Sequence, residues 1–94
     1  MTSTRRSFVD DDRAYLQWLS ANPDGFVLNT DRRPNSGYGA LHRSTCRSIS
    51  GTPARGRSWT ADYAKHCAAN SADLVTWIYA TVGNEPSHCK HCNP

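Results

Sequence analysis

Two short elements of this sequence have the residue types and spacing of metal-ligand pairs. Cys89 and Cys92 form a C-x2-C knuckle near the C-terminus, and His42 and Cys46 stand four positions apart much earlier in the chain. A C-x2-C loop turns back so that both sulfurs face one point, while His and Cys at their spacing lie on one face of a single helical turn. Structural zinc takes four sulfur or imidazole ligands, commonly from two such elements. The sequence therefore predicts one structural Zn²⁺ bound by His42, Cys46, Cys89 and Cys92.

Disulfide bonds are the first alternative for the cysteines. Four cysteines in a chain of 94 residues allow two disulfides, a pattern typical of small secreted domains. Residues 1–12, however, are polar and contain no apolar stretch of the length that a signal peptide needs. We therefore expect an intracellular, cytoplasmic protein with reduced thiols, which favours metal binding.

Other histidines and one further cysteine are alternative ligands. Cys67 falls in an expected strand, where a free cysteine usually acts as a small buried hydrophobe, and the adjacent His66 should point to the opposite face. His88 and His91 flank or lie within the knuckle, and we expect them to be exposed neighbours, with His91 left open as a ligand.

The composition explains why a small domain of this kind would need a metal. Only 37% of the residues are hydrophobic and the mean hydropathy is −0.69, which leaves little material for a core. A bound metal can add on the order of 10 kcal/mol to folding, enough to decide whether such a domain folds. No run of about 18 apolar residues is present, so no membrane span is expected.

The domain organisation follows from where apolar periodicity begins. We expect residues 1–9 to form a disordered tail and residues 10–94 to form a single domain. A helix should begin at a cap formed by Asp10 or Asp11. Its apolar stripe would consist of Tyr15, Leu16, Trp18 and Leu19.

The rest of the chain alternates between short strands and loops before a second helix. Residues 25–30 and 38–42 predict a hairpin that places His42 at the end of its second strand, and residues 63–67 predict a third strand. Between them, residues 47–58 predict an exposed loop with a short strand around Ile49. Ser71 should cap a helix that ends at Gly83. The expected fold class is α+β: a zinc-stabilised domain with a short antiparallel sheet of two or three strands packed against two helices.

This order of elements resembles a known family. A strand ending in His-x3-Cys, a further strand, a helix and a terminal Cys-x2-Cys are similar to the metal-binding domain of the Ada DNA-repair protein and related small modules, over residues 26–94. The resemblance implies one zinc on a small sheet and binding to DNA. In Ada the first ligand is a cysteine that accepts a methyl group; His42 holds that position here, so the resemblance implies binding without alkyl transfer.

The charge distribution also favours nucleic acid as the partner, with DNA expected. Residues 32–65 contain seven basic residues and a single acid, Asp62, although the net charge of the whole chain is only +3. Most of the basic residues are arginines, whose planar guanidinium pairs with phosphate and with guanine edges. Arg43 and Arg47 are the strongest candidates because they stand in and beside the metal element. The full predicted nucleic-acid-binding set is Arg32, Arg33, Arg43, Arg47, Arg55, Arg57, Lys65 and the loop-flanking Trp59, with Tyr38 as a further aromatic that would stack on a base.

Three other interpretations stay open. One is that the basic residues form only a solvated face, and another is that the domain binds a protein or peptide partner, as many small zinc modules do. A small nuclease using His66 with Lys65, or His88 with His91, is the enzymatic alternative. We assign no catalytic residue, because four protein ligands close the metal's coordination shell and the acids form no paired constellation. A role in a defence protein that reads modified or foreign DNA rests on general likeness alone.

Overall fold

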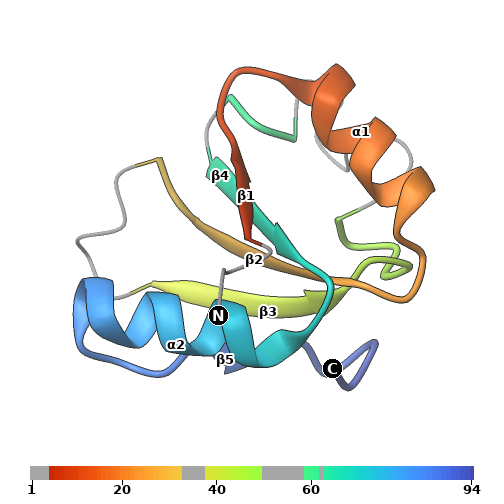
Figure 1. Ribbon diagram of the computed structural model, residues 1–94. Coiled ribbons are helices and arrows are strands. Elements are labelled where there is room, and N and C mark those ends of the chain that lie inside the picture. Colours follow the sequence, from red (N-terminus) through yellow and green to blue (C-terminus); the bar gives the residue numbers. More distant parts are fainter. Residues whose placement is uncertain (1–4, 33–37, 50–58, 62) are drawn as a thin grey trace.

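Two helices pack on a single five-stranded sheet in the computed structural model, which describes residues 5–32, 38–49, 59–61 and 63–94 (Figure 1). The elements in chain order are β1 (Arg6–Phe8), α1 (Asp12–Ala21), β2 (Phe26–Asp31), β3 (Gly39–Arg43), β4 (Tyr63–Ala68), α2 (Ser71–Val82) and β5 (Ser87–His88). The α+β class predicted from the sequence is confirmed.

The strand order in the sheet is β1-β4-β2-β3-β5. The hairpin of β2 and β3 and the third strand β4 form the antiparallel centre that the sequence predicts, while β5 runs parallel to β3 and makes the sheet mixed. The expected number of two or three strands is therefore wrong. The additional strands are the two edges, with three and two residues, which are too short to show an alternating apolar pattern.

The edge strand β1 lies inside the segment that we expected to be a disordered tail. It pairs with β4, with Ser7 opposite His66 and Phe8 opposite Lys65. Phe8 is buried, and its ring packs against that of Tyr15 at a centroid distance of 6.1 Å. One aromatic side chain and three ladder positions thus order a segment whose composition is otherwise polar.

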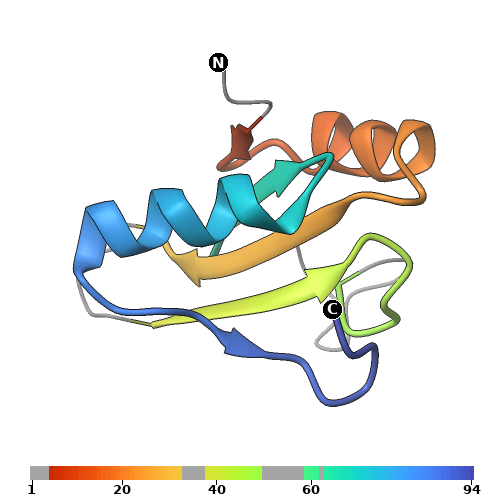
Figure 2. The same cartoon turned by 60° about the horizontal axis from the view of Figure 1, so that its bottom comes forward.

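The sheet buries a separate apolar cluster on each face. Val27 and the adjacent Leu28 of β2 point to opposite faces, as successive strand residues must, and both are fully buried. On the Val27 side the sheet packs against Tyr15 and Leu19 of α1, and these residues belong to the first cluster. On the Leu28 side it packs against α2, and this packing forms the second cluster. Figures 1 and 2 show the two helices well apart from each other. Buried side chains of the second cluster are Leu28, Leu41, Ala68, Leu74 and Ile78.

The helix caps follow the sequence closely. Asp11 caps α1 by accepting a hydrogen bond from the backbone N–H of Ala14, and Gly83 ends α2 in a left-handed conformation with a φ of 80°. The α2 cap is Asn70 instead of the predicted Ser71, which becomes the first helical residue. On α1, Leu16 is 39% exposed, so the apolar stripe is narrower than predicted. No helix in the described part of the chain is long and apolar enough to cross a membrane.

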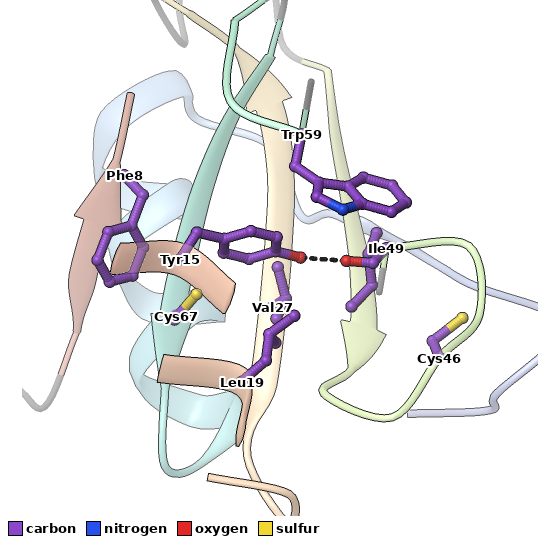
Figure 3. Close-up of a cluster of buried hydrophobic side chains, with 8 residues drawn as sticks. All are labelled: Phe8, Tyr15, Leu19, Val27, Cys46, Ile49, Trp59 and Cys67. Carbon is purple, nitrogen blue, oxygen red and sulfur yellow. Dashed lines mark hydrogen bonds between the residues drawn. The ribbon is translucent and has the colours of Figure 1, made fainter. Parts of the chain in front are cut away.

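The turn after β3 is fastened to the first cluster through Tyr15. Its hydroxyl donates a hydrogen bond to the carbonyl of Ile49, whose side chain is buried (Figure 3). Residues 47–49 form a turn instead of the short strand expected around Ile49. Cys46 begins this turn and lies at the margin of the same cluster, so the core reaches directly to a predicted metal ligand.

Candidate metal centre

The structure brings together the four residues that the sequence selects as metal ligands. The ligand atoms of His42, Cys46, Cys89 and Cys92 all lie within 4.8 Å of one another. His42 belongs to β3, Cys46 to the turn that follows it, and the two other cysteines to the segment after β5, which folds back beside that turn (Figure 2). This arrangement is compatible with one metal site.

Backbone hydrogen bonds shape the first ligand pair. The N–H of Cys46 donates to the carbonyl of Arg43 at 3.0 Å, and the N–H of Ser44 donates to the carbonyl of Gly25 at 3.0 Å. The chain from His42 to Cys46 is thus a strand end followed by a tight turn, not the single helical turn that the spacing predicts. Because this turn reverses the chain between His42 and Cys46, it still brings the cysteine sulfur close to the imidazole.

The second ligand pair is docked on the end of β3. The N–H of Cys89 donates to the carbonyl of Leu41 at 2.9 Å, which continues the β3–β5 pairing by one residue. The N–H of Asn93 donates to the carbonyl of Cys89 at 3.1 Å and closes the knuckle. In addition, the N–H of Arg43 donates to Sγ of Cys92 at 3.2 Å. These bonds place both sulfurs beside the end of the strand that carries His42.

The thiols of this group are not joined by a disulfide. Sγ of Cys46 and Sγ of Cys89 are 3.8 Å apart, almost twice the length of a disulfide bond of about 2.05 Å. All four cysteines of the chain are free. The two-disulfide alternative is therefore not what the structure contains.

His42 carries a buried nitrogen that lacks a hydrogen-bond partner among the described residues. Its Nδ1 is inaccessible to solvent, and a buried polar atom left unpaired costs free energy. Burial lowers the pKa of His42, and the positive charges of Lys65 and His91 lower it further. Imidazole must be neutral to bind a metal. A metal ion bound among the three sulfurs would satisfy this ring.

The electrostatics of the three neighbouring thiols also favour a bound cation. Burial alone would raise the pKa of Cys89, but the backbone N–H groups of Cys92 and His91 donate to its sulfur and lower that pKa. Burial raises the pKa of Cys92 to about 11, and the thiols of Cys46 and Cys89 add to this rise against the bond from the Arg43 N–H. Three thiolates this close together repel one another unless a positive ion compensates them.

An open cavity of about 730 Å³ lies directly beside the ligand group. Two of the ligands, Cys46 and Cys92, form part of its wall. The other lining residues are Arg43, Thr45, Arg47, Ser48 and His91. None of the described lining residues is acidic. The hydroxyls of Thr45 and Ser48 were not singled out from the sequence, although their positions next to a ligand were a usable signal.

Arg43 has a structural task that the sequence does not reveal. Its Nε donates to the carbonyl of Cys92 and its Nη2 to the carbonyl of Asn93, both at 2.9 Å. The guanidinium also lies 5.8 Å from the ring of Phe26. Arg43 therefore clamps the C-terminal segment, which leaves the exposed Arg47 as the main candidate for contacting a ligand in the cavity.

Two residues of the predicted nucleic-acid-binding set are buried, contrary to the prediction. Lys65 is only 3% exposed, and its Nζ donates to Oδ1 of Asn29 and to the carbonyl of Trp59. Trp59 is 8% exposed and belongs to the first apolar cluster (Figure 3). Its backbone N–H donates to Oδ2 of Asp12. The sequence signal for both is a local run of basic and loop residues, which carries no information about which side chains turn inward.

The remaining members of the set do not form one described surface. Arg32 makes a bidentate ion pair with Asp10, at 2.8 and 2.6 Å, and also donates to the carbonyl of Ala61. Arg33, Arg55 and Arg57 lie outside the described residues. Among the members of the set that the structure describes, only Arg43 and Arg47 line the cavity beside the metal ligands.

Cys67, Lys65 and His66 have other surroundings, whereas His91 lines the cavity beside the ligand group. Cys67 is fully buried, as expected, and burial raises its pKa to about 12. His66 hydrogen-bonds Ser7 Oγ at 2.7 Å and Thr30 Oγ1 at 2.9 Å. Lys65 and His66 therefore do not meet on one surface as a nuclease would require. His88 and His91 are exposed.

Comparisons with known proteins find no counterpart: no family model, no curated protein and no solved structure matches this chain. The class that the fold and the site define is a small α+β domain with a His/Cys₃ group compatible with metal binding.

Proposed function

We propose that this chain is a zinc-stabilised nucleic-acid-binding module, with DNA as its expected ligand. The observation that carries the proposal is the cavity lined by Arg43, Arg47 and two hydroxyl side chains, two of whose wall residues belong to the metal-ligand group. A rigid metal centre beneath such a cavity would hold its basic side chains in fixed positions.

The donor set supports zinc as the metal. One imidazole and three thiolates form a common structural zinc set, and a closed set of four protein ligands stabilises a fold without leaving a position for catalysis. Two sulfurs bound tetrahedrally to zinc at about 2.3 Å are about 3.8 Å apart. The distance between the sulfurs of Cys46 and Cys89 is 3.8 Å. Zinc would join the C-terminal knuckle to β3 and so secure the short edge strand β5.

The chemistry of the cavity supports a phosphate backbone as the contacted group. Arginine pairs with phosphate oxygens through two parallel N–H groups, and serine and threonine hydroxyls are frequent additional donors. Arg47, Ser48 and Thr45 are exposed and offer these groups together. Modified or foreign DNA is the finer form of this proposal, and it rests on no particular residue.

The resemblance to the Ada metal-binding domain is part of the same proposal. It consists of the spacing of the two ligand pairs along the chain, with His42 in place of the methyl-accepting cysteine. An imidazole bound to zinc is not the activated thiolate that alkyl transfer needs. The proposed activity is therefore binding alone.

Salt dependence of binding tests the proposal. Fluorescence anisotropy would measure the affinity of the metal-loaded protein for labelled duplex and single-stranded DNA across a salt series. Phosphate contacts release counterions, so affinity should fall steeply with salt, and Arg47→Ala should weaken binding and reduce the slope by about one unit.

Arg13→Ala is the matched control, because it removes the same charge from an exposed position on α1 that does not line the cavity. An equal effect of both variants would mean that only overall charge matters. Binding that ignores salt, or its complete absence with every DNA, would overturn the proposal and favour the peptide-binding alternative.

A further inference from the structure

Two exposed tyrosines meet at the end of the sheet away from the metal ligands. Tyr38 directly precedes β3, and Tyr63 begins β4. They are 42% and 44% exposed, and their ring centroids are 6.2 Å apart with an angle of 55° between the ring planes. Large apolar side chains exposed in the described residues are Val9, Leu16, Tyr38, Tyr63 and Tyr79. An aromatic pair at the surface leaves ring faces available for stacking.

A chain of hydrogen bonds connects Tyr38 of this pair to the interior of the fold. Nζ of Lys65 donates to Oδ1 of Asn29 at 2.5 Å and to the carbonyl of Trp59 at 2.6 Å. Nδ2 of the same Asn29 donates to the hydroxyl of Tyr38 at 3.2 Å. Asn29 and Lys65 are direct cross-strand partners on the centre of the sheet. The position of Tyr38 is thus tied to the buried core, which lowers the entropy lost when a ligand stacks on it.

The charges around the pair are mixed. Nζ of Lys65 lies 5.8 Å from the ring centroid of Tyr63, while Asp31 stands directly opposite Tyr63 in the β2–β4 register. Cross-strand partners project on the same face, so one cation and one carboxylate of the described residues adjoin the rings. A phosphate gains little from such a balance. A nucleobase suits it better, because a base has a flat face and an edge of hydrogen-bond donors and acceptors; asparagine and aspartate are side chains that read such edges.

We propose that Tyr38 and Tyr63 form a stacking platform for an unpaired base of single-stranded DNA, with Asn29 and Asp31 beside the polar edge of that base. The inference rests on the proposed nucleic-acid-binding function and adds a strand preference to it. Tyr38 precedes His42 by four residues, a distance of roughly 13 Å along an extended strand. An oligonucleotide of several nucleotides can therefore contact both the platform and the cavity at Arg47.

The test compares ring removal with removal of the hydroxyl alone. The metal-loaded protein and its Tyr63→Ala, Tyr38→Ala and Tyr63→Phe variants would be titrated with a labelled thymidine oligonucleotide, its duplex and the corresponding RNA. Each alanine variant should weaken single-strand binding about fivefold or more, the usual effect of losing one base–aromatic stack. Tyr63→Phe should stay within about twofold, because it keeps the ring.

Tyr79→Ala is the matched control, since Tyr79 is 58% exposed on α2 and is not part of the pair. Its binding should equal that of the wild type, and circular dichroism and metal content should be unchanged in every variant. If the alanine variants bind like the wild type while Arg47→Ala binds weakly, the platform is wrong and the nucleic-acid-binding function stands. If the wild type binds no oligonucleotide, both proposals fall. Tighter binding to RNA than to DNA would overturn the assignment to DNA.

Discussion

Arg43 and Cys92 are joined twice, once through the backbone and once through the guanidinium. The N–H of Arg43 donates to Sγ of Cys92 at 3.2 Å, and Nε of the same residue donates to the carbonyl of Cys92 at 2.9 Å. The first bond orients a metal ligand, and the second fixes the backbone that carries it. Groups that orient metal ligands in this way commonly contribute to metal affinity.

Replacing Arg43 by lysine should therefore loosen the metal site. Lysine keeps the charge but cannot donate to the carbonyls of Cys92 and Asn93 from one planar group. We expect the free energy of metal binding to weaken by about 1 kcal/mol, which would be measured as a several-fold faster transfer of metal to a coloured chelator. Arg47→Lys is the control and should release metal at the wild-type rate. Equal rates for all three proteins would show that the guanidinium clamp is not needed.

Metal content should distinguish the cysteines that bind the metal from Cys67, which is buried in the apolar core. Protein purified without added metal should contain one zinc per chain by mass spectrometry, and His42→Ala or Cys89→Ser should lose both the zinc and most of the folded structure. Cys67→Ala should keep its zinc and lose only about 1 to 2 kcal/mol of stability, since Cys67 is a fully buried packing residue. A metal-free wild type would refute the site, as would loss of zinc in Cys67→Ala alone.

The sequence predicts the ligand group and the centre of the sheet because both depend on local patterns. The spacing of His42 and Cys46 allows two sulfur or nitrogen ligands to converge whether the intervening residues form a helical turn or, as here, a strand end and a turn. The hairpin and β4 follow from alternating apolar residues between loop-forming segments. The ligand spacing is therefore informative even where the predicted local conformation is wrong.

Sequence fails where the outcome depends on contacts between distant residues. Lys65 is basic and lies in a basic segment, yet the register of β2 against β4 places its ammonium against Asn29 inside the fold. The strand β1 is ordered by pairing with β4 and by the burial of Phe8, neither of which leaves a periodic signal in three residues. For the same reason the sequence predicts only a strand position for Tyr63, not its contact with Tyr38.

Gly25 should not tolerate a side chain, whereas Gly39 should. A Cβ at position 25 would lie 2.7 Å from Cη2 of Trp18 and 3.0 Å from the carbonyl oxygen of Ala68, while a Cβ at position 39 would meet nothing closer than 3.5 Å. Gly25→Ala should therefore lower the free energy of unfolding by about 1 to 3 kcal/mol through overpacking. Gly39→Ala should be close to neutral. Thermal unfolding of the two variants checks this, and an equal loss in both would show that backbone freedom, not space, decides.

His66 should make the domain sensitive to mild acid. Its ring is 4% exposed, stacks on Trp77 at 4.3 Å and hydrogen-bonds Ser7 and Thr30 through its two nitrogens. Burial, with the positive charges of Arg5 and Lys65, lowers the pKa of His66 from 6.5 to about 4. The unfolded chain therefore binds a proton between these pH values that the folded chain does not, and the free energy of unfolding falls as the pH drops through this window.

His66 should account for roughly 3 kcal/mol of this loss, none of it above about pH 6.5 and all of it near pH 4. Protonation of the metal-binding thiolates also destabilises the domain in acid, so the measurement is a comparison. His66→Gln keeps a polar side chain of similar reach that does not titrate. Urea unfolding at pH 7 and pH 5 should show a smaller difference between the two pH values for this variant than for the wild type. Parallel pH dependences would mean that the imidazole stays protonated in the folded protein or that another group controls the acid response.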